Sequence, residues 1–350
     1  MTTPRATLTL VARKARVSLA TASKVLNGRS GVADETRDRV RAAMEELGYA
    51  PTTARADEPG AAVTRLTVIV SELDATLYNA QLLQAILAEA AAHECQVIVR
   101  LIRSDQGQVS GTQRELNVWA RSLLGGGCQG ALFVTCDLAK GHIDACERVG
   151  LPLLAVDCHT LLDAGVPSIS ANNFAGGYAQ AEHLIGLGHR RIGLVAGLQD
   201  STFARERAHG FRAAMADAGL RLPQELIHMG DFLPETGHAA ASEFLALDQP
   251  PTAIAANSDG CALGVMAAAR EHGLRVPEDL SVIGFDDTNQ ARWSVPKLTT
   301  IAQPVQEIGS LAVRTMLRLI SGAAPDSPHL QLATTLVVRE STASASPSRP

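Results

Sequence analysis

The sequence predicts an α/β protein in which a small all-α segment precedes a long body built on parallel sheets. Two observations indicate this fold class. Between residues 8 and 27, apolar residues recur three and four positions apart, which is the spacing of a buried helix face. From Arg65 onward, short β-branched runs alternate with segments of helical periodicity, which is typical of βαβ units. A chain of 350 residues is long enough for two or three domains with cores of their own.

The N-terminal segment has the pattern of two short helices joined by a tight turn. Ser18 is a suitable N-cap for the second helix. The predicted buried positions are Leu8, Val11, Ala12 and Ala15 in the first helix and Ala22, Val25 and Leu26 in the second. This pattern predicts a helix-turn-helix.

Charge is distributed unevenly along the chain. The whole sequence has a net charge of −5, yet residues 1–55 hold ten Lys and Arg against five Asp and Glu, a local charge of +5. The first acidic residue is Asp34, so the predicted second helix lies in a wholly basic segment. Such a segment suits the phosphates of a nucleic acid, and binding would weaken steeply with salt.

In a helix-turn-helix, side chains early in the second helix reach base edges in the major groove. We expect Lys24 to donate to a base edge such as that of guanine, and Leu19 and Ala20 to make apolar contacts, for instance with a thymine methyl group. Hydroxyl and amide side chains of the helix are expected to hold phosphates. The predicted DNA contacts are Ser18, Leu19, Ala20, Thr21, Ser23, Lys24, Asn27 and, in the following segment, Arg55.

The body is predicted to alternate strands and helices. The predicted strands are Leu66–Val70, Gln96–Leu101, Gly130–Val134, Leu153–Val156, Ser168–Ser170, Ile192–Val195, Leu226–Met229, Ala253–Ala256 and Ser281–Phe285. The predicted helices are Gln81–Ala92, Arg114–Leu124, Ala175–Leu187, Ala204–Ala218, Thr236–Leu247, Cys261–His272 and Gln306–Ile320. Gly188, Gly219 and Gly273 stand where helix C-caps belong.

The N-terminal segment closely resembles the headpiece of the LacI-type (lactose-repressor, GalR-like) family of bacterial transcription regulators. The resembling residues are Ala15–Asn27, Val32–Arg37, Arg39-Val40 and Glu45–Pro51. The body resembles the effector domain of the same family, which is related to periplasmic sugar-binding proteins. The resembling segments are Gly150–Asp157, Leu187–Leu194, Ala204–Arg207, Gly210-Phe211, Val276–Asp287, Leu298–Ile301 and Leu336–Ser341.

This resemblance implies a headpiece at 1–50, a linker at 51–64 and an effector-binding and dimerisation domain at 65–341. The domain would comprise subdomain one (about 65–172 and 299–330) and subdomain two (about 173–298 and 331–341), joined by crossovers near Asn172, Thr299 and Leu330. The segment 342–350 is expected to be a disordered tail. It lacks the leucine heptads of a tetramerising coiled coil, so we expect a homodimer that reads a pseudo-palindromic operator.

The linker and the turn of the headpiece depart from the family pattern. The Leu expected in the linker helix is replaced by Asp57 or Glu58, and Pro59-Gly60 would stop any helix early. The linker therefore either uses Ala54 and Arg55 differently or bends the DNA less, and a plain tether is the other alternative. Arg16 stands in the turn where the family often has Gly, and a positive φ there would cost roughly 1 kcal/mol.

Polar residues that follow the predicted strands mark a ligand site, because ligands collect beyond the carboxyl ends of parallel strands. These residues are Glu72, Asp137, Asp157, Asp259, Asp286 and the loop Gln199–Thr202. Arg205 and Phe232 follow this loop and the Leu226–Met229 strand. Carboxylates, a guanidinium and an aromatic face suit a polyhydroxylated ligand.

The resemblance assigns effector contact to Arg205 of the Ala-Arg-x-Arg motif, to Asp286 of Gly-Phe-Asp-Asp and to Phe232 as a stacking aromatic. The predicted effector-binding set is Arg205, Asp286, Phe232, Asp157, Ser201 and Asp259. Loop-capping roles would explain Asp157, Ser201 and Asp259 equally well. The family's aromatic run after the first strand is replaced by Ala75–Asn79, with Tyr78 as its remaining aromatic, which leaves a sugar and a sugar acid both open.

Other function classes fit the sequence less well. The six cysteines form no C-x2-C pair, so we predict no metal site. A transport binding protein would need a signal peptide, whereas the N-terminus offers basic helices and no transmembrane segment, which predicts a cytoplasmic protein. A dehydrogenase would need the Gly-x-Gly-x-x-Gly order, and neither it nor a catalytic triad is present. We therefore predict no enzyme and no cofactor, but a ligand-responsive repressor of a carbohydrate or sugar-acid operon.

Overall fold

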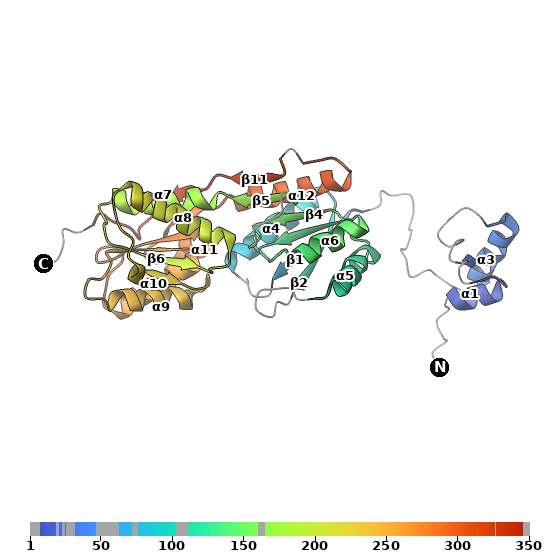
Figure 1. The fold of residues 1–350 in the computed structure, drawn as a ribbon, viewed down its shortest axis with the longest axis horizontal. Helices are drawn as coiled ribbons and strands as arrows, with labels where there is room; N and C mark the ends of the chain where they lie inside the picture. Colours follow the sequence, from blue (N-terminus) through green and yellow to red (C-terminus); the bar gives the residue numbers. More distant parts are fainter. Residues whose placement is uncertain are drawn as a thin grey trace. The chain divides into compact units, whose positions relative to one another are not determined.

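The computed structural model describes residues 8–18, 21–22, 25, 32–46, 63–71, 76–102, 111–159, 165–325 and 327–345. The chain divides into two compact units, Met1–Ala62 and Val63–Pro350 (Figure 1). The linker positions Asp57, Glu58 and Pro59 lie outside the described residues.

The N-terminal unit is a small helical domain. It contains α1 (Leu8–Lys14) and α3 (Asp34–Glu46), with Thr21, Ala22 and Val25 helical between them. Its core consists of Val11, Ala12, Ala15, Ala22, Val25, Val40 and Ala43, so the five described positions of the predicted buried face are confirmed. The side chains of Leu8 and Leu26 lie outside the described residues. Ser18 Oγ accepts from the Thr21 backbone N–H at 3.1 Å, which confirms the predicted cap.

Helix α1 ends in a left-handed turn at Arg16, whose φ is 54°. The Val17 N–H donates to the Ala12 carbonyl at 3.0 Å and the Arg16 N–H donates to the Arg13 carbonyl at 3.3 Å, which is the Schellman pattern of hydrogen bonds. The positive φ predicted for Arg16 is therefore confirmed.

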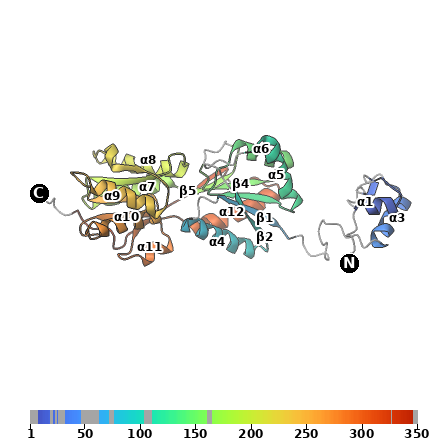
Figure 2. The ribbon, with the colours of Figure 1, turned by 90° about the horizontal axis from the view of Figure 1, so that it is seen from below.

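The first sheet of the body is wholly parallel, in the order β11-β5-β4-β3-β1-β2. Its strands are β1 (Arg65–Ser71), β2 (Gln96–Ile102), β3 (Gly130–Val134), β4 (Leu153–Val156), β5 (Ser168–Ala171) and β11 (His329–Leu332). Helices α4 (Leu77–Ala92) and α12 (Val305–Ile320) pack on one face, and α5 (Gln113–Gly125) and α6 (Lys140–Val149) on the other (Figure 2). This sheet and its helices are called lobe one.

The second sheet has the order β12-β10-β9-β8-β6-β7, with β12 antiparallel to β10. Its strands are β6 (Ile192–Gly197), β7 (Ile227–Met229), β8 (Ala253–Ala256), β9 (Ser281–Asp286), β10 (Thr299–Ala302) and β12 (Thr335–Val337). Helices α7 (Asn173–Gly186) and α8 (Thr202–Asp217) cover one face, and α9 (Pro234–Leu245) and α10 (Asp259–Glu271) cover the other (Figure 1). With the short α11 (Asn289–Trp293) and the 3-10 turn Gln224–Leu226, they form lobe two.

The chain crosses between the lobes three times. The first crossing is at Asn172, as expected. The second follows Ala302 and not Thr299, because Thr299–Ala302 pairs with β9 and β12 in lobe two. The third follows Leu332 and not Leu330, because β11 pairs with β5 throughout its length.

All the strands and helices predicted for the body occur within a few residues of their expected bounds. Helices α3, α6 and α11 and strands β10, β11 and β12 were not predicted. Helix α11 and the three strands are only three to five residues long, too short for a clear periodicity. Helix α6 has an apolar face that includes Ile143 and Cys146, and this signal was missed. Gly188, Gly219 and Gly273 have φ values of 92°, 68° and 72°, which confirms them as left-handed helix ends. None of the helices in the described part of the chain is long and apolar enough to span a bilayer.

The tail expected to be disordered from residue 342 is ordered through Ala345, which corrects that prediction. The Ala343 N–H donates to Ser281 Oγ at 3.1 Å, and the Ala345 N–H donates to the Leu187 carbonyl at 2.8 Å. The buried ring of His189 lies 3.1 Å from the Ala343 carbonyl. Backbone hydrogen bonds to lobe two therefore hold this segment in spite of its Ser- and Ala-rich composition.

We expect Arg16→Gly to stabilise the N-terminal unit by about 1 kcal/mol, because glycine adopts the left-handed conformation without the clash of a Cβ atom. Hydrogen exchange of the α1 amides in the full-length protein measures this effect. Arg16→Ala is the matched control, since it removes the same charge and keeps the Cβ atom. Equal exchange rates in the two variants would contradict the prediction that the left-handed backbone at Arg16 is strained.

Candidate ligand site between the lobes

Residues at the carboxyl ends of strands from both sheets meet in a cavity of about 400 Å³. Lobe one contributes the first turn of α4, the ends of β3 and β4, and the loop after β4. Lobe two contributes the first turns of α8, the loop before α9 and the end of β9. We call this space the interlobe cavity; its lining residues are Thr76, Tyr78, Asn79, Thr135, Asp157, His159, Phe203, Arg207, Phe232 and Asp286.

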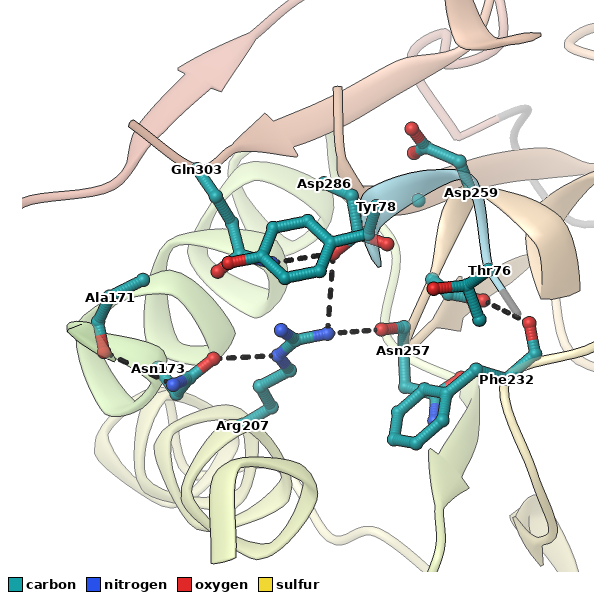
Figure 3. A network of polar contacts seen from close by, with 12 residues as sticks. Thr76, Tyr78, Ala171, Asn173, Arg207, Phe232, Asn257, Asp259, Asp286 and Gln303 are labelled. Carbon is teal, nitrogen blue, oxygen red and sulfur yellow. Dashed lines mark hydrogen bonds and ion pairs between the residues drawn. The ribbon is translucent and has the colours of Figure 1, made fainter. Parts of the chain in front are cut away.

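Arg207 is the central cation of the cavity (Figure 3). Its Nε donates to Asn173 Oδ1 at 2.8 Å, and its Nη1 donates to the Asn257 carbonyl at 2.6 Å. Nη1 also lies 3.6 Å from Asp286 Oδ1, and the guanidinium carbon lies 3.7 Å from the centroid of the Phe285 ring. The guanidinium is thus held on an aromatic face by hydrogen bonds from Nε and Nη1.

The structure corrects the sequence prediction for Arg205, which is exposed and does not line the cavity. The buried face of α8 consists of Ala204, Arg207, Ala208 and Phe211, at helical spacing. Arg205 lies one residue after Ala204 and therefore points about 100° away from that face. The sequence did hold a signal for the correct choice. Ala204, Ala208 and Phe211 recur at helical spacing, and Arg207, the second arginine of the motif, lies on the same helix face as they do.

Two buried carboxyl groups flank the arginine. Asp286 Oδ1 accepts from Gln303 Nε2 at 2.7 Å, and burial raises the pKa of Asp286 to about 8 although Arg207 opposes the rise. Asp157 accepts from the Tyr78 hydroxyl and from the Ala171 N–H at 3.3 Å. Burial raises the pKa of Asp157 as well, with the Tyr78 hydrogen bond opposing it.

Backbone strain and unsatisfied polar atoms gather at the cavity. Thr135, Asp157 and Asp286 have φ values of 45°, 45° and 115°, which L-residues rarely adopt. The Thr135 hydroxyl and both amide atoms of Asn257 are buried without a hydrogen-bond partner among the residues that the structure describes. Strain and orphaned polar groups of this kind concentrate at functional sites.

An aromatic wall closes one side of the cavity. The Phe203 and Phe232 rings lie 5.4 Å apart, centroid to centroid, with 34° between their planes. The His159 ring lies 4.8 Å from Phe203, and its Nδ1 lies 3.3 Å from Ser201 Oγ. The His159 carbonyl accepts from the Thr202 N–H at 2.8 Å. His159 therefore links lobe one to the start of α8.

Ser201 and Asp259, two of the other predicted ligand contacts, have structural roles. Ser201 Oγ caps α8 by accepting from the Ala204 N–H at 3.4 Å. Asp259 is fully buried, and its oxygens accept from the Thr288 N–H at 2.6 Å and from Thr300 Oγ1 at 2.5 Å. Burial raises the pKa of Asp259 to about 6. Neither residue lines the interlobe cavity, which agrees with the capping alternative, whereas Asp157, Asp286 and Phe232 line it.

The sequence prediction did not include Arg207, Thr135, His159 and Phe203 in the ligand set. For the DNA-binding set, Ser18 and Thr21 are described, and their hydroxyl oxygens lie 2.8 Å apart at the start of the second helix. The remaining predicted DNA contacts lie outside the described residues: Leu19, Ala20, Ser23, Lys24, Asn27 and Arg55.

Comparison with known proteins places both parts of the chain. Residues 7–52 match the family of bacterial regulatory proteins known as the lacI family, and residues 181–342 match a periplasmic binding protein-like domain. Catabolite control protein A of Priestia megaterium is 31% identical over 334 residues, which cover 95% of this chain and 98% of that protein. The transcriptional repressor PurR of Pectobacterium carotovorum is 32% identical over 340 residues, which cover 97% of each.

Solved structures agree. The transcriptional regulator CelR in complex with cellobiose is 30% identical, with a TM-score of 0.70 over 96% of this chain and 100% of that chain. The Lac repressor dimer bound to operator and the anti-inducer ONPF has the same identity and TM-score over 97% of this chain and 100% of that chain. These relatives are transcriptional regulators, not enzymes. With the helical N-terminal unit and the two-lobed body, this similarity shows that the chain belongs to the lacI family and is a transcriptional repressor with a ligand-binding domain.

Proposed function

We propose that this repressor is a cytoplasmic homodimer that is gated by a small polyhydroxylated effector, a sugar or a sugar acid, and that it controls an operon for the use of that compound. The observation that carries the proposal is the interlobe cavity, where one arginine lies between two buried carboxyl groups beside aromatic rings. No cofactor, metal or catalytic step is part of the proposal.

The polar groups of the cavity suit sugar hydroxyls. Arg207 Nη2 has no hydrogen bond among the described residues and is available as a donor. Asp286 retains acceptor capacity beyond the bond from Gln303. Phe203 and Phe232 offer an apolar face for the carbon-bound hydrogens of a sugar ring, and because the two rings contact each other, a flat nucleobase does not fit between them.

Gating follows from the position of the ligand between two lobes. A ligand that contacts both lobes binds one relative arrangement of them more tightly and shifts the population toward it. A coupling of about 1–3 kcal/mol would change operator affinity about 5–150-fold. The headpieces of a dimer would then place two recognition helices in successive major grooves of a pseudo-palindrome.

Selection of bound duplexes from a random pool, followed by binding measurements with a panel of sugars, sugar acids and purine bases, tests the proposal. We expect one pseudo-palindromic duplex to be enriched and its affinity to change with a sugar or a sugar acid. A response to purine bases alone would overturn the proposed effector class. Binding with no preference among duplexes would overturn the proposed DNA readout.

We expect Arg207→Lys to weaken effector binding by roughly 10–100-fold, since lysine cannot reproduce the forked geometry of the guanidinium. Arg205→Lys is the matched control, because the same change is made two residues away on the exposed side of α8. Isothermal titration of both full-length variants measures the affinity. An equal loss of effector affinity in both variants, or no loss in either, would contradict the role of Arg207.

The titration of Asp286 distinguishes the two effector classes. Its pKa of about 8 means that the unfolded carboxyl releases its proton first, so folding loses stability as the pH rises between about 4 and about 8. Above that range the folded side chain is ionised and accepts hydroxyl hydrogen bonds more strongly. We therefore expect a neutral sugar to bind more tightly as the pH rises through about 8, and a sugar acid to bind less tightly because two carboxylates then share Arg207.

Calorimetric titrations across this range with wild type and with Asp286→Asn check the pH prediction. The variant removes the titrating group and keeps an acceptor oxygen, so its affinity should not change through pH 8. If the effector affinity of the wild type changes with pH as little as that of the variant, Asp286 is not the group that titrates at the site.

For DNA readout, we expect Lys24→Ala to reduce discrimination against a wrong base pair by about 1–3 kcal/mol at one operator position. Lys140→Ala, at an exposed lysine of the body, is the control for the loss of one positive charge. Competition gel shifts with single-base operator variants measure the discrimination. Unchanged sequence selectivity in Lys24→Ala would remove Lys24 from the base-reading set.

A further inference from the structure

Two of the six cysteines lie side by side at the carboxyl ends of neighbouring strands. Strands β3 and β4 are parallel, and their last residues, Val134 and Val156, lie opposite each other. Two residues further on, the His159 N–H donates to the Cys136 carbonyl at 3.4 Å, so the two segments continue to pair. Cys136 therefore lies opposite Cys158. We call this pair the strand-end dithiol.

A matched bend in both strands turns the two cysteines to the same face of the sheet. The last residue of each strand faces α4 and α12, and regular alternation would place the cysteines on that face as well. The residues between, Thr135 and Asp157, both have a φ of 45°, which interrupts the alternation at the same level in the two strands. Cys136 and Cys158 consequently pack in the opposite core, beneath α5 and α6.

The two thiols are in contact. Cys136 Sγ donates to the Ile69 carbonyl at 3.7 Å, and Cys158 Sγ donates to the Phe133 carbonyl at 3.5 Å. Contact with the Cys158 thiol is the largest cause that raises the pKa of Cys136, and burial adds to it. Paired strands lie about 4.8 Å apart, within the range of about 4.4–6.8 Å that a disulfide spans between Cα atoms. A disulfide therefore fits between these two strands.

The two thiols differ in their access to solvent. The Cys136 side chain is buried, with 1% of its surface exposed. Cys158 is half-buried and lines a groove between β5, β11 and the first turns of α8. A small oxidant can thus reach Cys158 directly, with Cys136 behind it. An accessible thiol beside a second cysteine that can resolve its oxidised form is the arrangement of redox-sensing sites.

We propose that Cys136 and Cys158 form a reversible intramolecular disulfide when the protein meets a hydroperoxide. The bond would join the two strand ends at the ligand site, because Thr135 and Asp157, which line the interlobe cavity, directly precede the two cysteines. This redox site goes beyond the proposed effector response and needs no effector. In a reducing cytoplasm such a bond is transient and reports oxidation.

The chemistry proceeds in two steps with hydrogen peroxide as the oxidant. The Cys158 sulfur attacks one peroxide oxygen, the O–O bond breaks, and Cys158 becomes a sulfenic acid while one water leaves. The Cys136 sulfur then attacks the Cys158 sulfur, the S–O bond breaks, and the hydroxyl group leaves as a second water with the proton of Cys136. The dithiol loses two electrons and two protons in total, which reduce the peroxide to water. Exchange with an external thiol reverses the bond.

Oxidation of the reduced full-length protein with hydrogen peroxide, followed by alkylation of the remaining thiols and mass spectrometry, tests the proposal. We expect at least roughly half of the chains to take up two alkyl groups fewer, and dithiothreitol to restore both. Chymotrypsin cuts after Phe133 and so separates Cys128 from Cys136, and the linked peptides should hold Cys136 and Cys158. A link between other cysteines, or Cys158 oxidised to a sulfinic acid without a link, would overturn the inference.

Three variants assign the steps to each thiol. Cys158→Ser should reduce the loss of alkyl groups to less than roughly a tenth of the wild-type value. Cys136→Ser should leave Cys158 as a sulfenic acid that dimedone traps. Cys95→Ser, at another half-buried thiol of lobe one, is the matched control and should behave as the wild type. Melting curves of the reduced variants verify that each is folded.

An equal loss of alkyl groups in Cys158→Ser and in the wild type would place the reactive thiols elsewhere and overturn the inference. The measurements use neither an effector nor an operator. Their failure would therefore leave the proposed function intact, and failure of the proposed function would leave the strand-end dithiol in place.

Discussion

A guanidinium buried between two lobes must find partners for its N–H groups, and the arrangement around Arg207 meets this requirement. Removing such a cation from water costs several kcal/mol unless hydrogen bonds and polar neighbours compensate. The compensating groups come from separate parts of the chain: Asn173 just after the first crossing, the Asn257 carbonyl after β8, and Asp286 at the end of β9. Asp286 is in turn held by Gln303, which lies on the second crossing. A ligand at Arg207 is therefore connected to two of the three segments that join the lobes.

The position of Arg207 depends on how closely α7 and α8 approach. A Cβ atom on Gly177 would lie 2.0 Å from the Arg207 carbonyl oxygen, and one on Gly210 would lie 2.0 Å from the Phe174 carbonyl oxygen. Glycine at both positions lets the two helix backbones touch, which brings the arginine side chain within reach of Asn173 on α7. The close packing of α7 against α8 therefore also fixes the position of the Arg207 side chain in the site.

The sequence predicted the order of elements well because the signals were local. Helical spacing located the core of the N-terminal unit, and alternation of β-branched runs with helices located most of both sheets. The site was predicted less well, because strand ends indicate where polar side chains gather but not which way each one faces. Asp259 follows a strand as Asp157 does, yet its oxygens are used by Thr288 and Thr300. These partners lie 29 and 41 residues further along the chain, and only the folded sheet brings them together.

The unsatisfied groups of the cavity indicate where gating energy arises. Among the described residues, the Thr135 hydroxyl is buried without a partner, and such a group costs about 1–3 kcal/mol. Thr135 lines the interlobe cavity, so a sugar hydroxyl that bonds its oxygen does so from between the lobes. Thr135 belongs to lobe one and Arg207 to lobe two, and a ligand that bonds both stabilises one relative position of the two sheets. A free energy of this size is sufficient for the coupling of about 1–3 kcal/mol that separates a responsive regulator from an unresponsive one.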